Sequence, residues 1–157
     1  MPNALVALLF MAAAGGAPRR DGYPRQPLDV EHYRFALTLF DSTDRIAGQA
    51  TVRMRLLAAN LHAVTLDLAG ASAARQGRGM QVSSVSRAGK ALAFTHAADR
   101  LTITLDHASA AGEVVEFVVR YAGIPADGLQ IKPTTHGDRT FFSDDWPDKA
   151  HHWLPTI

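Results

Sequence analysis

The segment Gln49-Ala50-Thr51-Val52-Arg53-Met54-Arg55-Leu56 decides the fold. Every second residue from Ala50 to Leu56 is apolar, and the residues between them are polar or charged. Successive side chains of a β-strand point to opposite faces of its sheet, so this alternation predicts a strand with one buried and one solvated face. A strand of that kind is typical of antiparallel sheets.

The same period of two recurs on both sides of this segment. Further strands are predicted over residues 32–40, 64–68, 80–87, 91–95, 101–105, 115–121, 129–131 and 140–142. Polar and glycine-containing turns separate them, and a change of phase between Val82 and Val85 predicts a bulge or a bend. About seven to nine strands without a convincing helical period predict an all-β fold, a mostly antiparallel β-sandwich.

The composition predicts one ordinary globular domain. The chain has 157 residues, of which 47% are hydrophobic and 20% charged, so it can bury a core. Its formal net charge is +1 and no long run of one sign occurs, which argues against a nucleic-acid partner. Cysteine is absent, which excludes disulfides, thiolate metal sites and a cysteine nucleophile.

The N-terminus has the pattern of a targeting segment. Residues 4–14 are uninterruptedly apolar, and small residues follow at Gly15, Gly16 and Ala17. This pattern predicts a signal peptide over residues 1–17, cleaved after Ala14 or Ala17, and hence a periplasmic or secreted protein. The run is shorter than the roughly 20 residues of a membrane span, so no transmembrane segment is predicted. The proline-containing residues 18–28 predict an extended leader before a domain at 29–157.

Motifs that mark a complete active site do not occur in the sequence. It contains no His-Glu-x-x-His, no Gly-x-Ser-x-Gly and no phosphate-binding glycine loop. No catalytic residue is therefore assigned.

The segment 141–157 contains the main candidates for functional residues. Trp146 is flanked by Asp144, Asp145 and Asp148, so carboxylates could meet a cationic group beside an apolar indole wall. An exposed acidic turn that ends a strand is the alternative interpretation.

Three histidines near the C-terminal end form the remaining candidate. His136, His151 and His152 with an aspartate could hold zinc, which would make the chain a metalloenzyme on its own. Adjacent histidines in a strand point to opposite faces, however, so His151 and His152 are poorly placed to share one ion. No metal ligand is therefore predicted in this chain.

The order of several segments resembles the N-terminal domain of M1-family zinc aminopeptidases over residues 29–157. The most specific segments are Tyr121-Ala-Gly123, Thr140-Phe-Phe-Ser-Asp-Asp-Trp-Pro147 and His151-His-Trp-Leu-Pro155, and the others are residues 33–39, 46–52, 64–68 and 128–129. The resemblance implies a saddle-like β-sandwich packed against a thermolysin-like catalytic domain. That domain carries Gly-x-Met-Glu-Asn and the zinc motif His-Glu-x-x-His, neither of which occurs here.

The resemblance also implies what the chain does. In the family an Asp-x-Pro motif follows this region, so the chain, ending at Ile157, is expected to be truncated before its catalytic domain and inactive alone. Zinc belongs to the implied full-length enzyme, which would remove N-terminal residues from peptides. A Gln or Glu of the family's N-terminal domain holds the substrate's ammonium, but that position falls on Trp146, so Asp144, Asp145 or Asp148 is expected to supply the carboxylate.

The predicted function is therefore a non-catalytic N-terminal domain that walls the active site and helps to select peptide N-termini. The alternative is a stand-alone β-sandwich that binds a peptide or a carbohydrate.

Overall fold

A computed structural model describes residues 26–157. The predicted signal peptide at 1–17 lies outside the described residues. Within them the chain forms ten strands and two short 3₁₀ helices: β1 (Leu28–Leu39), β2 (Ile46–Leu56), β3 (Ala63–Asp67), η1 (Ala73–Arg75), β4 (Gly79–Arg87), β5 (Lys90–Ala91), β6 (Phe94–Ala97), β7 (Arg100–Thr104), β8 (Val114–Ile124), β9 (Leu129–Pro133), β10 (Arg139–Ser143) and η2 (Ala150–His152).

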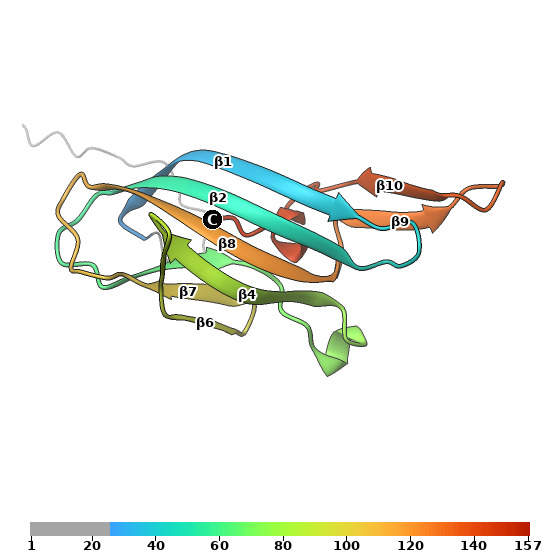
Figure 1. Cartoon of the computed structure of the whole chain (residues 1–157), viewed down its shortest axis with the longest axis horizontal. Helices are drawn as coiled ribbons and strands as arrows, with labels where there is room; N and C mark the ends of the chain where they lie inside the picture. Colours follow the sequence, from blue (N-terminus) through green and yellow to red (C-terminus); the bar gives the residue numbers. More distant parts are fainter. Residues whose placement is uncertain (1–25) are drawn as a thin grey trace, which may run out of the picture.

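Two sheets face each other, and a hairpin projects from one end (Figure 1). The larger sheet has the order β1-β2-β8-β4-β5, and the smaller one has the order β3-β7-β6. The strands β9 and β10 form the hairpin. All named strand pairs are antiparallel, which confirms the predicted all-β fold. No helix among residues 26–157 is long and apolar enough to cross a membrane.

The core lies between the two sheets, and it includes side chains of the segment 49–56 that predicted the fold. The inward side chains of β2, from Ala50 to Leu56, are fully buried. Val52 pairs with Phe117 of β8, whose side chain is also fully buried. The facing side chains of the smaller sheet are Val64, Leu66, Leu101 and Ile103. Burying each large side chain contributes about 1.5–3 kcal/mol, so these strands supply much of the stability.

The first strand begins earlier than predicted. It starts at Leu28 instead of residue 32, and its register shifts between Val30 and His32. The intervening Glu31 forms ion pairs with Arg53 and Arg55 of β2. The bulge interrupts the period of two, which is why the alternation alone placed the start too late.

The predicted single strand at 91–95 is wrong, because two strands of different sheets lie there. β5 pairs with β4 in the larger sheet, and β6 pairs with β7 in the smaller one. Leu92 lies between them with only 9% of its surface exposed. The chain changes sheets around this apolar residue, which is a known way to turn a corner of a sandwich.

A third difference concerns the C-terminal segment. The adjacent histidines His151 and His152 were expected in a strand, but residues Ala150–His152 form the 3₁₀ helix η2. Trp153 nevertheless packs into the core, with 6% of its surface exposed. The predicted bulge in β4 is confirmed by a register shift between Val82 and Ser84.

Candidate functional site

The acidic segment after β10 is held in place by Gly128, just before β9. Gly128 has a φ of +78°, a conformation that side chains disfavour. A Cβ atom there would lie 2.7 Å from Oδ1 of Asp145 and 2.7 Å from the carbonyl oxygen of Lys149. Glycine is therefore needed so that the segment can fold directly against the start of the hairpin.

Asp145 is directed toward the protein interior. Its Oδ1 accepts a hydrogen bond of 2.9 Å from Nε1 of the buried Trp153. Its backbone carbonyl accepts a bond of 2.9 Å from the N–H of Lys149. This carboxylate uses one oxygen to fix the indole of Trp153. Only the second oxygen of Asp145 is left for any other contact.

The other three predicted site residues are more accessible. The side chain of Trp146 is 81% exposed. Asp144 is half-buried, and its backbone N–H donates to the carbonyl of Gly128 at 2.7 Å. Oδ1 of the exposed Asp148 lies 3.6 Å from Nδ1 of His151. The structure thus gathers the predicted carboxylates in one turn but gives Asp145 a structural contact.

Asp148 also lines a cavity of about 610 Å³. Its other lining residues are Gln26, Leu28, Asp29, Val30, Tyr33, Asp67, Arg100, His151, Thr156 and Ile157. Two further carboxylates thus line the cavity with Asp148, while Arg100 lies 4.0 Å from Asp67. Burial, and to a smaller extent the charge of Asp67, raises the pKa of Tyr33, so its phenol is uncharged at neutral pH. The excess of carboxylates suits a cationic group.

Sequence reasoning missed this cavity because its residues come from distant segments. Asp29 is in β1 and Asp67 ends β3, and only the fold brings them to Asp148. No local pattern signals such a convergence.

The candidate histidines are arranged differently from the prediction. His151 and His152 lie in η2 rather than in a strand, and their ring centroids are 4.3 Å apart. Burial, and then the neighbouring His151, lowers the pKa of His152. His136 lies in the turn of the projecting hairpin. Across residues 26–157, no three His, Asp or Glu side chains are placed to hold a metal ion, so the described residues offer no zinc site.

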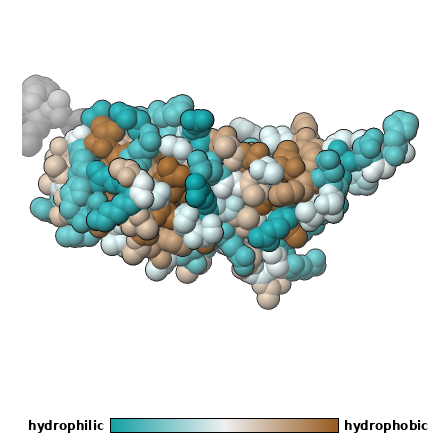
Figure 2. Space-filling view, in the orientation of Figure 1, coloured by the Kyte–Doolittle hydropathy of each residue, from teal (hydrophilic) through white to brown (hydrophobic). Residues whose placement is uncertain are grey.

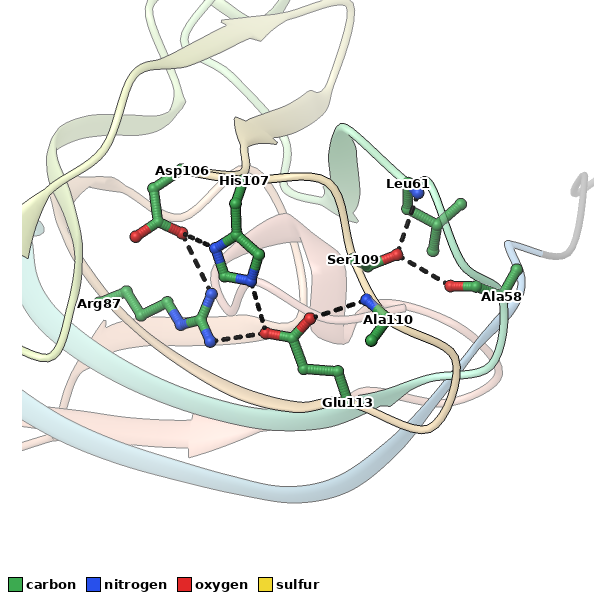
Figure 3. Close-up of polar contacts among 8 residues, drawn as sticks. All are labelled: Ala58, Leu61, Arg87, Asp106, His107, Ser109, Ala110 and Glu113. Carbon is green, nitrogen blue, oxygen red and sulfur yellow. Dashed lines mark hydrogen bonds and ion pairs between the residues drawn. The ribbon is translucent and has the colours of Figure 1, made fainter.

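A second polar cluster, which the sequence did not predict, lies around the loop between β7 and β8 (Figure 3). Arg87 and His107 both contact the carboxylates of Asp106 and Glu113. Nearby Ser109 is buried, with 4% of its surface exposed.

Ser109 is a structural residue rather than an activated nucleophile. Its Oγ donates to the carbonyl of Ala58 at 2.8 Å and accepts from the N–H of Leu61 at 3.0 Å. Both contacts tie the loop before β8 to the loop after β2. His107 is not among its hydrogen-bond partners, so the pair lacks the contact that activates a serine.

Of the comparisons with known proteins, only the comparison of structures found similar proteins. No family model matches the sequence, and no curated protein matches it. Solved structures do match. A mutant of a two-domain M1 zinc metallopeptidase bound to L-tryptophan has a TM-score of 0.66 and 23% identity, with 84% of this chain and 30% of that chain covered.

Two structures from Deinococcus radiodurans are equally similar. An M1 zinc metallopeptidase has a TM-score of 0.64, and a mutant of it bound to a Tyr-Ser-Ala substrate has a TM-score of 0.63. Each is 26% identical to this chain, with 83% of this chain and 29% of that chain covered. The chain therefore spans only about 30% of the length of these proteins. Its structure confirms the resemblance to M1-family zinc metallopeptidases that the sequence predicted.

Proposed function

We propose that this chain is the non-catalytic N-terminal domain of an exported zinc aminopeptidase, and that it borders the active site and helps to select peptide N-termini. The observation that carries the proposal is the structural match to M1 zinc metallopeptidases of much greater length. Zinc and the residues that bind it would belong to the remainder of the enzyme.

Uncovered apolar side chains support a contact with further protein. Leu37, Leu39 and Phe40 end β1 and begin the following turn, and each is at least 37% exposed. Phe142 of β10 is 64% exposed. Figure 2 shows apolar residues gathered near the base of the projecting hairpin. An ion pair between Arg139 and Asp44 ties this hairpin to the turn after β1, so the apolar ends of both elements lie in one region.

The acidic turn supports the selection of a free amine. A peptide N-terminus is an ammonium group, and carboxylates bind it through charge-assisted hydrogen bonds. Asp148 lines the carboxylate-rich cavity, and Asp144 and the second oxygen of Asp145 are further candidates. The exposed indole of Trp146 adds an apolar wall beside them.

The proposal is tested on the protein encoded by the complete gene. We expect it to hydrolyse aminoacyl p-nitroanilides, to lose this activity with a zinc chelator and to regain it with added zinc. N-acetylated substrates should not be cleaved, because they lack the ammonium group. A complete protein without zinc-dependent aminopeptidase activity contradicts the proposal and favours the stand-alone binding module.

The amine contact gives a specific prediction. In that protein, Asp148→Asn should raise KM for aminoacyl substrates at least about tenfold, because a lost charge-assisted bond is worth about 1.5–3 kcal/mol. Asp144→Asn tests the second carboxylate in the same way. Asp138→Asn in the hairpin turn is the matched control and should leave KM unchanged. Steady-state kinetics measure all three, and an unchanged KM for both site variants removes these aspartates from amine binding.

A further inference from the structure

The hairpin of β9 and β10 is a two-stranded sheet that projects from the sandwich (Figure 1). Among residues 26–157, no further strand pairs with the outer edge of either strand. A free edge presents unpaired backbone N–H and C=O groups, to which an extended peptide can add as a further strand. The backbone groups of the two edges decide which of them can accept such a strand.

Two hydrogen bonds at the ends of the hairpin define its bonding pattern. At one end, the N–H of Asp144 donates to the carbonyl of Gly128 at 2.7 Å. At the other end, the N–H of Thr134 donates to the carbonyl of Asp138 at 2.6 Å. Both pairs continue the register of β10 against β9. Opposed residues of antiparallel strands alternate between hydrogen-bonded and non-hydrogen-bonded pairs, so these two bonds assign every pair between them.

The pattern leaves every second residue of β10 with unused backbone groups. Thr140 and Phe142 fall in the hydrogen-bonded pairs and direct their backbone groups to β9. Arg139, Phe141 and Ser143 direct theirs to the free edge. Within the part of the chain that the structure describes, none of these three N–H groups has a hydrogen-bond partner. The edge of β10 therefore offers donors and acceptors at the spacing that an added strand needs.

The free edge of β9 is less suited to accept a strand. Pro133 lies opposite Arg139 in a non-hydrogen-bonded pair, and it has no N–H to direct outward. The N–H of Leu129 already donates to the carbonyl of Asp127 at 2.9 Å. Two of the three outward positions of β9 thus offer no donor, and only Ile131 differs. A peptide is therefore expected on the edge of β10.

The charges at the two ends of β10 determine the direction of an added peptide. The strand begins at Arg139, which pairs with Asp44, and it ends before the turn that holds Asp144, Asp145 and Asp148. In an antiparallel arrangement the N-terminal ammonium of the peptide lies beside this turn, where carboxylates bind it through charge-assisted bonds. In a parallel arrangement the C-terminal end of the peptide would approach the turn, and its carboxylate would be repelled. The antiparallel arrangement is therefore favoured.

We propose that the free edge of β10 binds an extended peptide as an antiparallel strand, with the peptide N-terminus at the acidic turn 144–148. The choice of occupant rests on the proposed function, because a peptide with a free N-terminus is the substrate of an aminopeptidase. β10 spans five residues, so about five residues of the peptide can pair with it. Phe142, whose side chain is 64% exposed, gives these residues an apolar neighbour on one face of the hairpin.

The first test measures KM of the complete protein for pentapeptides with a single N-methyl group at residue 3, 4 or 5. Residues 1 and 2 stay unmodified because they flank the bond that is cleaved. A methyl group removes one N–H of the peptide, and successive N–H groups of a strand point to opposite edges. We expect residues 3 and 5 to behave alike and residue 4 to differ from them. Methylation of an N–H that faces β10 should raise KM about tenfold, and methylation of the others less than about twofold. Equal effects at all three positions overturn the proposal.

A second test changes the edge itself. Ser143→Pro removes one outward N–H of β10 and leaves the bonds to β9 in place. We expect it to reduce the preference of the complete protein for a pentapeptide over a dipeptide, measured as a ratio of KM values, by about fivefold. Thr135→Pro is the control, because Thr135 is the second residue of a turn in which the N–H of Gly137 donates to the carbonyl of Thr134 at 3.1 Å. Proline is favoured at that position, so this variant should keep the wild-type ratio. An unchanged ratio in Ser143→Pro overturns the proposal.

The two proposals fail in different ways. Zinc-dependent aminopeptidase activity without alternating effects of the methyl groups keeps the proposed function and overturns the pairing with β10. If the complete protein has no such activity, the same methylated peptides are titrated into it by calorimetry, and the dissociation constant replaces KM. Alternating dissociation constants then support the pairing with β10 although the proposed function has failed. Binding without alternation, or no binding, overturns the pairing as well.

Discussion

Trp153→Ala is expected to lower the free energy of unfolding by about 3–5 kcal/mol, the usual loss when a buried aromatic side chain is removed. Trp153 is the buried member of the core that comes from the C-terminal segment, with 6% of its surface exposed. The substitution leaves a cavity where the indole now packs against the core. It also leaves the carboxylate of Asp145 without the indole N–H from which it now accepts a hydrogen bond of 2.9 Å. Urea unfolding followed by circular dichroism measures the effect.

Two further variants separate packing from hydrogen bonding. Trp153→Phe keeps most of the apolar ring and loses the N–H, so its loss should be nearer the roughly 1.5–3 kcal/mol of a bond to a charged group. Trp146→Ala, at a side chain that is 81% exposed, should change the stability by no more than about 0.5 kcal/mol. Equal effects of Trp153→Ala and Trp146→Ala would show that the C-terminal segment is not anchored through Trp153.

Gly123→Ala is expected to lower the free energy of unfolding by at least about 3 kcal/mol, although it adds a single methyl group. Gly123 of β8 pairs with Met80 of β4. A Cβ atom on Gly123 would lie 2.1 Å from the carbonyl oxygen of Gly79 and 2.9 Å from Cα of Met80. Both are backbone atoms of the paired strand, so neither can rotate away. Only a separation of β4 from β8 relieves the overlap.

The control for this prediction is another glycine with open space around it. Gly89 has a φ of +80°, and no atom lies within 4 Å of the position that an added methyl group would take. Gly89→Ala should therefore cost only the backbone strain of about 1–2 kcal/mol. Circular dichroism and urea unfolding of the two variants give the comparison, and similar losses for both would contradict the close approach of β4 and β8.

The strands that face both solvent and core were predictable from the sequence. In β2 the alternation from Ala50 to Leu56 is physically enforced, because a shift by one residue would expose every apolar side chain. The same holds for β8, where the buried residues Val115, Phe117, Val119 and Tyr121 alternate with the more exposed residues Glu116, Val118 and Arg120. Such strands fix the fold class without knowledge of their partners.

The alternation of residue types did not predict the structure where the chain changes direction while the alternation continues. Leu92 is apolar and fits the alternation of its neighbours, so nothing in the sequence shows that the chain passes there from one sheet to the other. The few residues around His152 are equally compatible with a strand and with the 3₁₀ turn that forms.

The sequence predicted which segment holds the candidate site, but it did not predict how the side chains of that segment are arranged in space. The carboxylates around Trp146 are adjacent in the sequence and could be found there. The inward turn of Asp145 depends on Trp153 and on the space beside Gly128, and both are properties of the folded chain. The cavity and the His107 cluster depend on still more distant pairings, which one sequence does not reveal.

The position of β2 between β1 and β8 in the larger sheet also bears on the order in which the protein assembles as it is synthesised. β2 can form a hairpin with β1 as soon as both have left the ribosome, because they are joined by a short turn. Its other partner, β8, follows on the order of 60 residues later. The β1–β2 hairpin therefore lacks this neighbouring strand until β8 has been synthesised. During that interval the hairpin exposes the surface that chaperones bind, and pauses in translation before β8 would prolong its exposure.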